Sequence, residues 1–527
     1  MSAATRLRRL NEGAEIVVLE RTGYVSFANC GLPYHVGGVI EERSSLLLQT
    51  PESLAARFRL DVRVRTEAVS FDPVKHLVTI RDLADGTEAD LPYDRLILAP
   101  GAAPVVPPIP GIESAHVLRN VEDLDSLTAA VATAKSAAII GGGFIGLEIA
   151  ENLRHRGLAV AVLEALPQAM APLDPELATI VHRRLRDGGV DLRLGAAVQG
   201  IEGDQVRLAD GSSVSADLVL CAVGVRPDTR LADLAGLDLG RGGAILVDQF
   251  GRTSADDVYA VGDAVAKRDA LDGSDVLVPL ANTANLQGRR VADHIAGHAR
   301  PGRAVAGTAI VGVFGLQAAV TGWNEKRLVA AGRPHRIIHT HPTSHAGYYP
   351  GAAALALKLL VDPDTDAILG AQAVGEDGAD KRIDVIATAM AGSITASGLA
   401  DLELAYAPQF GSAKDPVTML GLVAENLRDG VTDTIQWHEL DDALAAGATL
   451  IDVRTPGEFD AGSIPGALNV PVDDLRDRLA ELPGGDLIVH CAVGVRGHTA
   501  ARILQAAGRQ VRNLDGGYRT WEAATSR

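Results

Sequence analysis

Residues 137–164 read AAIIGGGFIGLEIAENLRHRGLAVAVLE, and this stretch decides the fold. Its apolar start, Ala137 to Ile140, predicts a short buried strand, and the pattern from Leu147 to Arg156 predicts a helix. A second apolar run, Ala159 to Leu163, predicts another strand, which ends in Glu164. A strand, a glycine turn, a helix, a second strand and an acid together predict a βαβ unit that binds a dinucleotide.

The glycines of this unit and its terminal acid each have a physical role. Gly141 turns the chain, Gly143 lets a pyrophosphate approach the helix N-terminus, and Gly146 allows the helix to pack closely. Glu164 would accept hydrogen bonds from the ribose hydroxyls and repel a 2′-phosphate. The sequence therefore favours NADH over NADPH, and use of NADPH stays open.

The N-terminus repeats the second half of this pattern. Ser2 to Leu10 predicts a helix, Glu15 to Leu19 predicts a strand, and Glu20 is the acid. In the complete unit the third glycine lies 18 residues before the acid, and the same count back from Glu20 reaches Ser2. We therefore expect the first strand and glycine turn to precede Met1, which would be an internal methionine of the native chain.

A later stretch indicates that this first unit binds a flavin. Residues 257–264, DVYAVGDA, predict a strand that ends in Gly262 and Asp263. A carboxylate at that point can accept hydrogen bonds from ribityl hydroxyls. Two dinucleotide units in one chain therefore predict FAD and NADH as cofactors.

Cys30 lies in the turn-prone stretch 26–34, SFANCGLPY, directly after a predicted strand. Most isolated cysteines are small buried hydrophobes, whereas glycines and a proline around this one predict a strand-to-helix transition that could lower its pKa. Because no second cysteine lies nearby, redox chemistry at Cys30 requires a partner thiol brought from outside.

A second thiol, Cys491, follows the predicted strand Leu487 to His490 and precedes the predicted helix Thr499 to Ala507. Backbone N–H groups of the loop CAVGVR, which ends at Arg496, can surround the sulfur and stabilise a thiolate or persulfide. The same hexapeptide begins at Cys221, where Pro227 follows and no long helix is predicted. We expect Cys491 to be catalytic and Cys221 to be structural.

Residues 1 to about 428 resemble the flavoprotein disulfide reductases that bind two dinucleotides, and the stretch around Cys30 resembles their single-cysteine coenzyme A branch. The resemblance implies that Cys30 is the redox-active cysteine, with Ser26 and Asn29 beside the pantetheine path. It also implies a homodimer, in which tyrosines of the partner subunit lie near the flavin and the thiol. The implied residues are Tyr348 and Tyr406 as catalytic tyrosines, and Arg6, Arg9 and Lys414 as ligands of coenzyme A phosphates or the thiolate.

Residues 436–527 resemble a single rhodanese domain. The resemblance rests on Cys491 and on three other groups of residues, Asp452 with Arg454, Glu458 with Phe459, and the run Asn513 to Gly517. It implies a sulfurtransferase site in which Cys491 carries sulfur and Arg496 binds the substrate.

The predicted fold class is α/β, with two Rossmann-like dinucleotide-binding domains, an α+β dimerisation domain and a C-terminal α/β rhodanese domain. The predicted bounds are 1–110 with 240–302 for FAD, 111–239 for NAD(P)H, 303–428 for dimerisation and 436–527 for rhodanese.

The composition of the chain limits its possible partners and its cellular compartment. A formal net charge of -18 argues against nucleic acid as a partner, and three cysteines in 527 residues do not make a disulfide framework. No run is apolar for long enough to span a membrane. We expect a cytoplasmic protein.

Four histidines lie close together in the sequence, at His335, His339, His341 and His345. Their spacing suits no common metal site, and we expect these side chains to be surface or interface residues without a metal.

The sequence therefore predicts a flavoenzyme in which NADH reduces coenzyme A disulfide or persulfide through Cys30, with sulfur carried on Cys491. Two alternatives remain. One is an NADH oxidase or peroxidase that cycles Cys30 through a sulfenic acid. The other is a flavin-free sulfur carrier or sensor that uses Cys491 alone.

Overall fold

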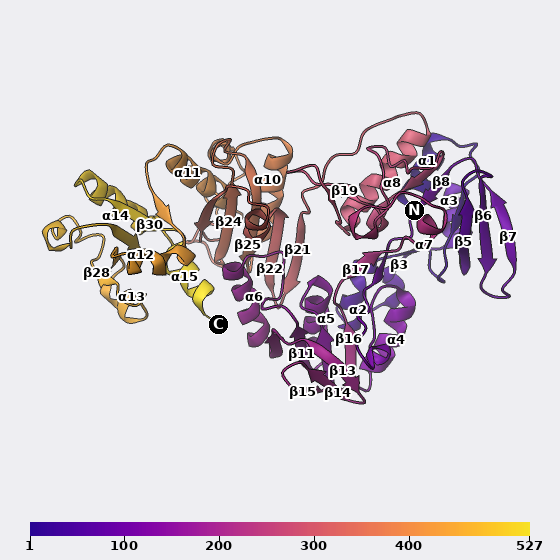
Figure 1. Ribbon diagram of the computed structural model, residues 1–527, viewed down its shortest axis with the longest axis horizontal. Coiled ribbons are helices and arrows are strands. Elements are labelled where there is room, and N and C mark those ends of the chain that lie inside the picture. The colour runs from indigo at the N-terminus through magenta and orange to yellow at the C-terminus, as the bar shows by residue number, and fades with distance from the viewer. Residues whose placement is uncertain (527) are drawn as a thin grey trace. The chain divides into compact units, whose positions relative to one another are not determined.

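The computed structural model describes residues 1–526. The chain divides into two compact units, the first formed by Met1–Ala169 with Arg186–Gly307 and the second by Met170–Leu185 with the residues from Thr308 onward (Figure 1). No helix within residues 1–526 has the length and apolar character that a membrane span needs.

A four-stranded parallel sheet in the first unit holds the glycine turn. Its order is β12-β11-β10-β16, and α5 connects the two central strands. This helix begins at Phe144, three residues earlier than predicted, so that Phe144, which is half-buried, and Ile145, which is exposed, belong to its first turn. The bounds in this region are α4 (Val121–Val131), β10 (Ser136–Ile140), α5 (Phe144–His155), β11 (Ala159–Glu164), β12 (Val190–Leu194), β13 (Val198–Glu202), β14 (Gln205–Leu208), β15 (Ser213–Ser215) and β16 (Leu218–Cys221).

The rest of the first unit carries Cys30. Its parallel strands form two pairs, β1 with β4 and β8 with β18, and β5, β6 and β7 form an antiparallel sheet. The prediction of a further strand and glycine turn before Met1 stays a prediction. The bounds are α1 (Ser2–Leu10), β1 (Val17–Leu19), β2 (Ser26–Phe27), η1 (Asn29–Gly31), α2 (Leu32–Val36), β3 (Leu47–Gln49), α3 (Pro51–Phe58), β4 (Asp61–Arg63), β5 (Thr66–Asp72), β6 (Leu77–Asp82), β7 (Glu88–Pro92), β8 (Leu96–Leu98), β9 (Ala102–Pro104), β17 (Val225–Pro227), α7 (Arg230–Leu234), β18 (Val258–Ala260) and α8 (Ala281–Ile295).

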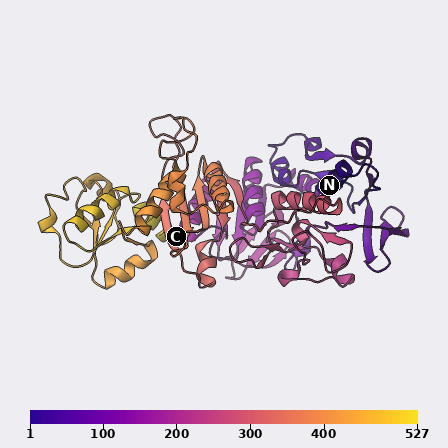
Figure 2. The ribbon, with the colours of Figure 1, turned by 90° about the horizontal axis from the view of Figure 1, so that it is seen from above.

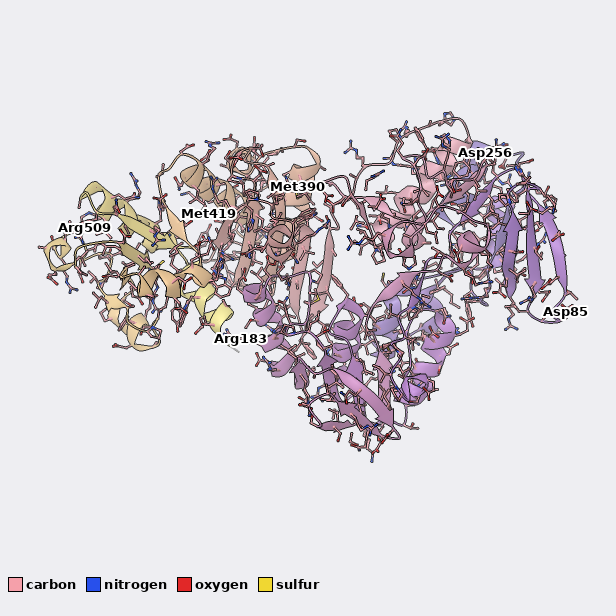
Figure 3. The ribbon with its side chains drawn as sticks, in the orientation of Figure 1. Asp85, Arg183, Asp256, Met390, Met419 and Arg509 are labelled. Atoms are coloured by element: carbon pink, nitrogen blue, oxygen red, sulfur yellow. The ribbon has the colours of Figure 1, made fainter. Side chains whose placement is uncertain are left out.

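A five-stranded antiparallel sheet, in the order β21-β22-β25-β24-β23, forms the first layer of the second unit. Buried side chains of α10 and α11, among them Ile383 and Leu420, pack against it, and Met390 on α10, labelled in Figure 3, joins the same core. The bounds are α6 (Pro175–Asp187), β21 (Ala309–Val313), β22 (Leu316–Gly322), α9 (Glu325–Ala330), β23 (Arg336–Thr340), β24 (Leu355–Val361), β25 (Ile368–Gly375), α10 (Ala379–Ala391) and α11 (Pro416–Arg428).

The C-terminal residues form a parallel sheet in the order β26-β30-β29-β27-β28, with helices around it (yellow in Figure 2). Cys491 follows the central strand β29. Helix α14 begins at Val495, directly after Gly494 and four residues earlier than predicted, so Arg496 lies in its first turn. The bounds are β26 (Thr434–Ile435), α12 (Leu440–Ala445), β27 (Thr449–Asp452), α13 (Pro456–Asp460), β28 (Leu468–Asn469), β29 (Leu487–His490), α14 (Val495–Ala506), β30 (Val511–Leu514) and α15 (Gly517–Thr525).

Candidate active sites

Cys30 lies in the short turn η1, between the end of β2 and the start of α2, and its side chain is exposed. The Leu46 side chain packs against this turn, since a Cβ added to Gly31 would come within 2.6 Å of it. Asn29 is fixed by a hydrogen bond from its Nδ2 to the Arg119 carbonyl oxygen, at 2.9 Å. The fold thus presents a single thiol on a supported turn, where a dissolved thiol compound can reach it.

Two residues beside this thiol were missed by the sequence reasoning. The Tyr34 hydroxyl donates to Glu148 Oε1 at 3.3 Å. Burial, with Glu148 and with charge on Cys30, raises the pKa of Tyr34 to about 12, and burial also raises the pKa of Glu148. Tyr34 is in the stretch quoted around Cys30 and Glu148 directly follows the glycine turn. Only the fold brings them together, because 114 residues separate them.

The predicted ligands of coenzyme A differ in availability. Ser26 is half-buried on β2, and Arg9 is exposed, with its guanidinium 5.9 Å from the Phe58 ring. Arg6 instead donates to Asp293 on α8, with Nε 2.6 Å from the carboxylate. A phosphate at Arg6 would therefore share the guanidinium with Asp293, whereas Arg9 has no carboxylate partner among the described ion pairs.

The nicotinamide-dinucleotide turn fits the group that the sequence predicts. Gly141 has a φ of +108°, and a Cβ on Gly146 would come within 2.1 Å of the Gly141 carbonyl oxygen. In contrast, a Cβ on Gly143 would meet nothing within 4 Å, which leaves room for a pyrophosphate in front of α5. Glu164 lies beside this turn and accepts from the Gly142 N–H at 2.7 Å. The residues present fit NADH.

The predicted flavin residues all belong to the first unit. Glu20 follows β1 and accepts from the N–H and the hydroxyl of Thr22. Asp263 follows β18, and its carboxylate lies 3.5 Å from the Arg119 guanidinium, while Gly262 has a φ of +87°. The acid after each of these strands can accept hydrogen bonds, one from the adenosine ribose and the other from the ribityl hydroxyls, so these residues fit the two parts of FAD that they would hold. Arg119, which also contacts Asn29, was not predicted.

Tyr348 and Tyr406 are brought together in the second unit. Their hydroxyl oxygens lie 3.1 Å apart across 58 residues of sequence, and the side chains are 77% and 50% exposed. The hydrogen bond between them raises the pKa of Tyr348. Lys414 is exposed. This exposed pair of phenols, contributed by two separate segments, is available to a ligand or to a second protein surface.

Cys491 is buried and lies at the N-terminal end of α14. The Gly494 N–H donates to its Sγ at 3.2 Å, and Asn513 Nδ2 donates to the Gly494 carbonyl oxygen at 3.2 Å. The N–H groups of Tyr518 and Arg519, in the first turn of α15, donate to the carbonyl oxygens of Cys491 and Ala492 at 2.8 and 3.0 Å. The thiol is therefore held by a loop that leads into α14 and that the first turn of α15 contacts through two hydrogen bonds.

Gly517 shows how tightly α15 approaches this loop. Its φ is +62°, and a Cβ at this position would lie 2.4 Å from the Cys491 carbonyl oxygen. Both the backbone conformation and the close approach therefore require glycine.

A carboxylate orients the predicted substrate arginine. Glu458, in the first turn of α13, binds Arg496 through both of its oxygens, at 2.6 and 2.7 Å. Hydrogen bonding to Arg496 lowers the pKa of Glu458 to about 2, despite opposing desolvation. Charge on Cys491 is among the causes that raise the pKa of Arg496, which places the guanidinium close to the sulfur.

Replacing Arg496 with Met is expected to slow the alkylation of the Cys491 thiol by iodoacetamide about tenfold at neutral pH, because a cation beside a thiol favours the reactive thiolate. The measurement is the pH dependence of alkylation, followed by mass spectrometry. Arg502→Met, on the same helix, is the control, because Arg502 bonds to Val431 and Gln505 instead. An unchanged pH profile in the Arg496 variant would contradict the assignment.

Cys221 has a different environment despite its identical hexapeptide. It ends β16, is 5% exposed, and is followed by β17 rather than a helix. Burial raises the pKa of this thiol. The prediction that only Cys491 is followed by a long helix is therefore confirmed.

The histidine cluster differs from the prediction. His339 and His345 are buried, at 4% and 6% exposed, and are not surface residues. His339 contacts residues 163 and 176 positions away in the sequence, which no local pattern could reveal.

Comparisons with known proteins agree with this arrangement. A model of the pyridine nucleotide-disulphide oxidoreductases matches residues 1–288, a model of their dimerisation domain matches 308–416, and a model of rhodanese-like domains matches 436–524. The coenzyme A disulfide reductase of Staphylococcus aureus (strain JH9) is 30% identical over 429 residues, which cover 80% of this chain and 97% of that protein.

Two solved structures are similar over nearly the whole chain. Reduced CoADR-RHD of Bacillus anthracis is 46% identical with a TM-score of 0.98, covering 99% of this chain and 96% of that one. An NAD-dependent persulfide reductase from A. fulgidus is 36% identical with a TM-score of 0.92, covering 99% and 97%. The predicted resemblances and fold class are confirmed. The chain therefore belongs to the pyridine nucleotide-disulphide oxidoreductase family, whose members use FAD and NAD(H).

Proposed function

We propose that this chain uses NADH to reduce coenzyme A disulfide or coenzyme A persulfide through Cys30, and that it carries sulfane sulfur on Cys491. The observation that carries the proposal is the exposed Cys30 thiol on a supported turn, in a chain that also holds a second thiol against a helix N-terminus. The named relatives, a coenzyme A disulfide reductase and a persulfide reductase, support it.

Cys30 supplies the nucleophile. Its thiolate attacks one sulfur of coenzyme A disulfide, forming a mixed disulfide and releasing one coenzyme A thiolate. With coenzyme A persulfide, the thiolate attacks the inner sulfur, which is bonded to carbon, so that the same mixed disulfide forms, the S–S bond of the persulfide breaks and hydrosulfide leaves. FAD, which Glu20, Gly262 and Asp263 would hold, would when bound supply the two electrons from NADH that reduce the mixed disulfide. Cys30 is thereby returned to the thiolate and the remaining coenzyme A is released as a thiol.

Groups around Cys30 position the substrate. Asn29 and Ser26 flank the thiol, and Arg9 offers a charge for a phosphate, with Arg6 and Lys414 as further basic ligands. Tyr348 and Tyr406 would reach the site from a partner subunit, and we propose a homodimer, which the match to the dimerisation domain supports. Glu20, Gly262 and Asp263 would hold FAD, and the turn Gly141 to Gly146 with Glu164 would hold NADH.

Cys491 supplies the second reaction. Its thiolate attacks the sulfane sulfur of a donor, the bond between that sulfur and the rest of the donor breaks, and the rest leaves as an anion. The persulfide that forms on Cys491 is stabilised by loop N–H groups and Arg496. A thiol such as coenzyme A can then accept this sulfur, and the resulting persulfide is a substrate for Cys30.

The domain bounds that we propose are 1–110 with 240–302 for FAD, 111–239 for NAD(P)H, 303–428 for dimerisation and 436–527 for rhodanese. Three free cysteines support a reducing, cytoplasmic setting.

The test is NADH oxidation by the purified protein with coenzyme A disulfide, coenzyme A persulfide and oxygen as parallel acceptors, after its visible flavin absorption has been recorded. We expect flavin absorption and turnover with the two coenzyme A compounds. Oxygen as the best acceptor would favour an oxidase instead. Absence of flavin together with intact sulfur transfer at Cys491 would favour a sulfur carrier.

Glu164 is expected to set the coenzyme preference. Glu164→Gln keeps an oxygen for the Gly142 N–H and removes the charge that repels a 2′-phosphate, so the ratio of kcat/KM for NADH to that for NADPH should fall roughly tenfold. Steady-state kinetics with both coenzymes measure this ratio. Glu202→Gln, an exposed change on β13, is the control. An unchanged ratio in the Glu164 variant would contradict the assignment.

A further inference from the structure

A network of buried charges in the second unit connects the antiparallel sheet to the Cys491 loop. Its centre is Lys358 on β24, whose Nζ lies 3.0 Å from Asp174, 2.6 Å from Glu176 and 2.5 Å from Glu325. Three carboxylates at such distances resemble a cation site, and the Lys358 ammonium group fills it. No metal is needed to explain this cluster.

His339 on β23 extends the network toward the C-terminal sheet. Its Nδ1 lies 2.7 Å from Asp515 Oδ2, and its Nε2 lies 3.1 Å from Glu176 Oε1. A carboxylate without its proton can only accept hydrogen bonds, so both ring nitrogens must donate. The geometry therefore requires the imidazolium form. Burial opposes this charge, but Asp515 and Glu176 outweigh burial and raise the pKa of His339 to about 9.

Asp515 and the residues directly after it connect His339 to the loop that holds Cys491. Asp515 follows β30 and also accepts from the backbone N–H of His339 at 2.9 Å. Gly516 packs against the same histidine, since a Cβ at Gly516 would lie 2.8 Å from the Cβ of His339. Two residues later, the N–H of Tyr518 donates to the carbonyl oxygen of Cys491.

We propose that His339 is a positioning residue for Cys491: as an imidazolium bridging Glu176 and Asp515, it fixes the start of α15, whose backbone N–H groups hold the Cys491 loop. The proposal rests on the proposed sulfur transfer at Cys491. It assigns a role in that reaction to a residue on β23, outside the C-terminal sheet that carries the thiol.

The test is the loading of Cys491 with sulfur from thiosulfate, followed by sulfite release in a single turnover by the full-length protein. The Cys491 thiolate forms a bond to the outer sulfur of thiosulfate, and the S–S bond of thiosulfate breaks to release sulfite. His339→Gln removes the charge and can donate to only one of the two carboxylates. We expect loading to slow roughly ten- to a hundredfold, the usual effect of losing a hydrogen bond between charged groups.

His335→Gln is the matched control, because His335 lies on the segment before β23 and its Nδ1 contacts the nearby Arg333 carbonyl oxygen rather than a carboxylate. It should load at the wild-type rate. A rate within twofold of wild type for His339→Gln, whatever its thermal stability, would overturn the proposal. Should that variant not fold, Asp515→Asn tests the same link from the other side, with the same loss expected.

The pH profile of the wild-type protein separates positioning from a purely structural role. The groups facing His339 are Asp515 beyond β30, Glu176 on α6, Lys358 on β24 and His341 after β23, with Arg519 on α15 close to His341. Because the pKa of His339 is raised from 6.5 to about 9, its contribution is complete below pH 6.5 and is lost as the pH rises through 9. Loading should therefore fall above pH 9 in the wild type and show no such fall in His339→Gln. A wild-type rate that stays constant to pH 10 would contradict the proposal.

Failure of the proposed function can be told apart from failure of this inference. If the wild type takes no sulfur from thiosulfate, sulfur transfer at Cys491 is not supported. Alkylation of Cys491 by iodoacetamide needs no sulfur chemistry and still compares wild type, His339→Gln and His335→Gln. Equal alkylation rates in all three would reject the positioning role.

Discussion

Replacing Cys30 with Ser is expected to abolish NADH-dependent reduction of coenzyme A disulfide and coenzyme A persulfide, with a loss of about a thousandfold or more. A serine hydroxyl is a poor nucleophile toward sulfur at neutral pH and cannot form the mixed disulfide. The exposed turn should tolerate the change, because it replaces one small side chain by another. Steady-state NADH oxidation with each acceptor measures the effect.

Cys221→Ser is the control for this variant. Cys221 is buried in the same unit and lies at a strand end, so the change should leave turnover near the wild-type rate. In the Cys30 variant, bleaching of the flavin absorption by NADH should persist, since that step does not use the thiol. Retention of more than a tenth of wild-type turnover with coenzyme A disulfide would show that Cys30 is not the nucleophile.

Replacing Cys491 with Ser is expected to remove sulfur loading from thiosulfate by about a thousandfold or more, while reduction of coenzyme A disulfide continues at the wild-type rate. Only sulfur can carry the transferred sulfur as a persulfide. The hydrogen bond from Gly494 and the nearby Arg496 would then surround a hydroxyl that does not ionise at neutral pH.

The identical hexapeptide at Cys221 makes this a controlled comparison. Cys221→Ser changes the same residue in the same local sequence and should keep full sulfur loading, because β17 rather than a long helix follows that cysteine. Equal loss of coenzyme A disulfide reduction in Cys491→Ser and Cys30→Ser would contradict two separable sites and indicate one obligatory relay.

The dinucleotide-binding turn and the loop that holds Cys491 could both be predicted from the sequence. The turn around Gly141 and the loop after Cys491 each occupy one continuous stretch, in which glycines, a strand and a helix follow in order. Their chemistry is therefore readable from spacing. The helices α5 and α14 nevertheless begin earlier than predicted, because each starts directly after a glycine, where the sequence predicts that the preceding loop continues.

Partners that are distant in the sequence could not be predicted in this way. Tyr34 with Glu148, and Arg119 with Asn29, are pairs within one unit whose members lie 114 and 90 residues apart. The predicted CoA-phosphate ligand Arg6 has an acidic partner in Asp293, 287 residues away. Each of these residues alone resembles an ordinary helix, turn or surface residue.

Cys491 and His339 illustrate the difference between what local residue order predicts and what only the fold shows. The sequence by itself determined the glycine turn with its flanking strands and helix, the place of Cys30 in a short turn after a strand, and the long helix that follows Cys491 but not Cys221, because the order of elements within a short stretch follows from local residue order. Only the tertiary structure decided that His339 is buried between Glu176 and Asp515. Its charge depends on carboxylates that chain folding brings from more than 160 residues away, and no spacing rule acts over that separation.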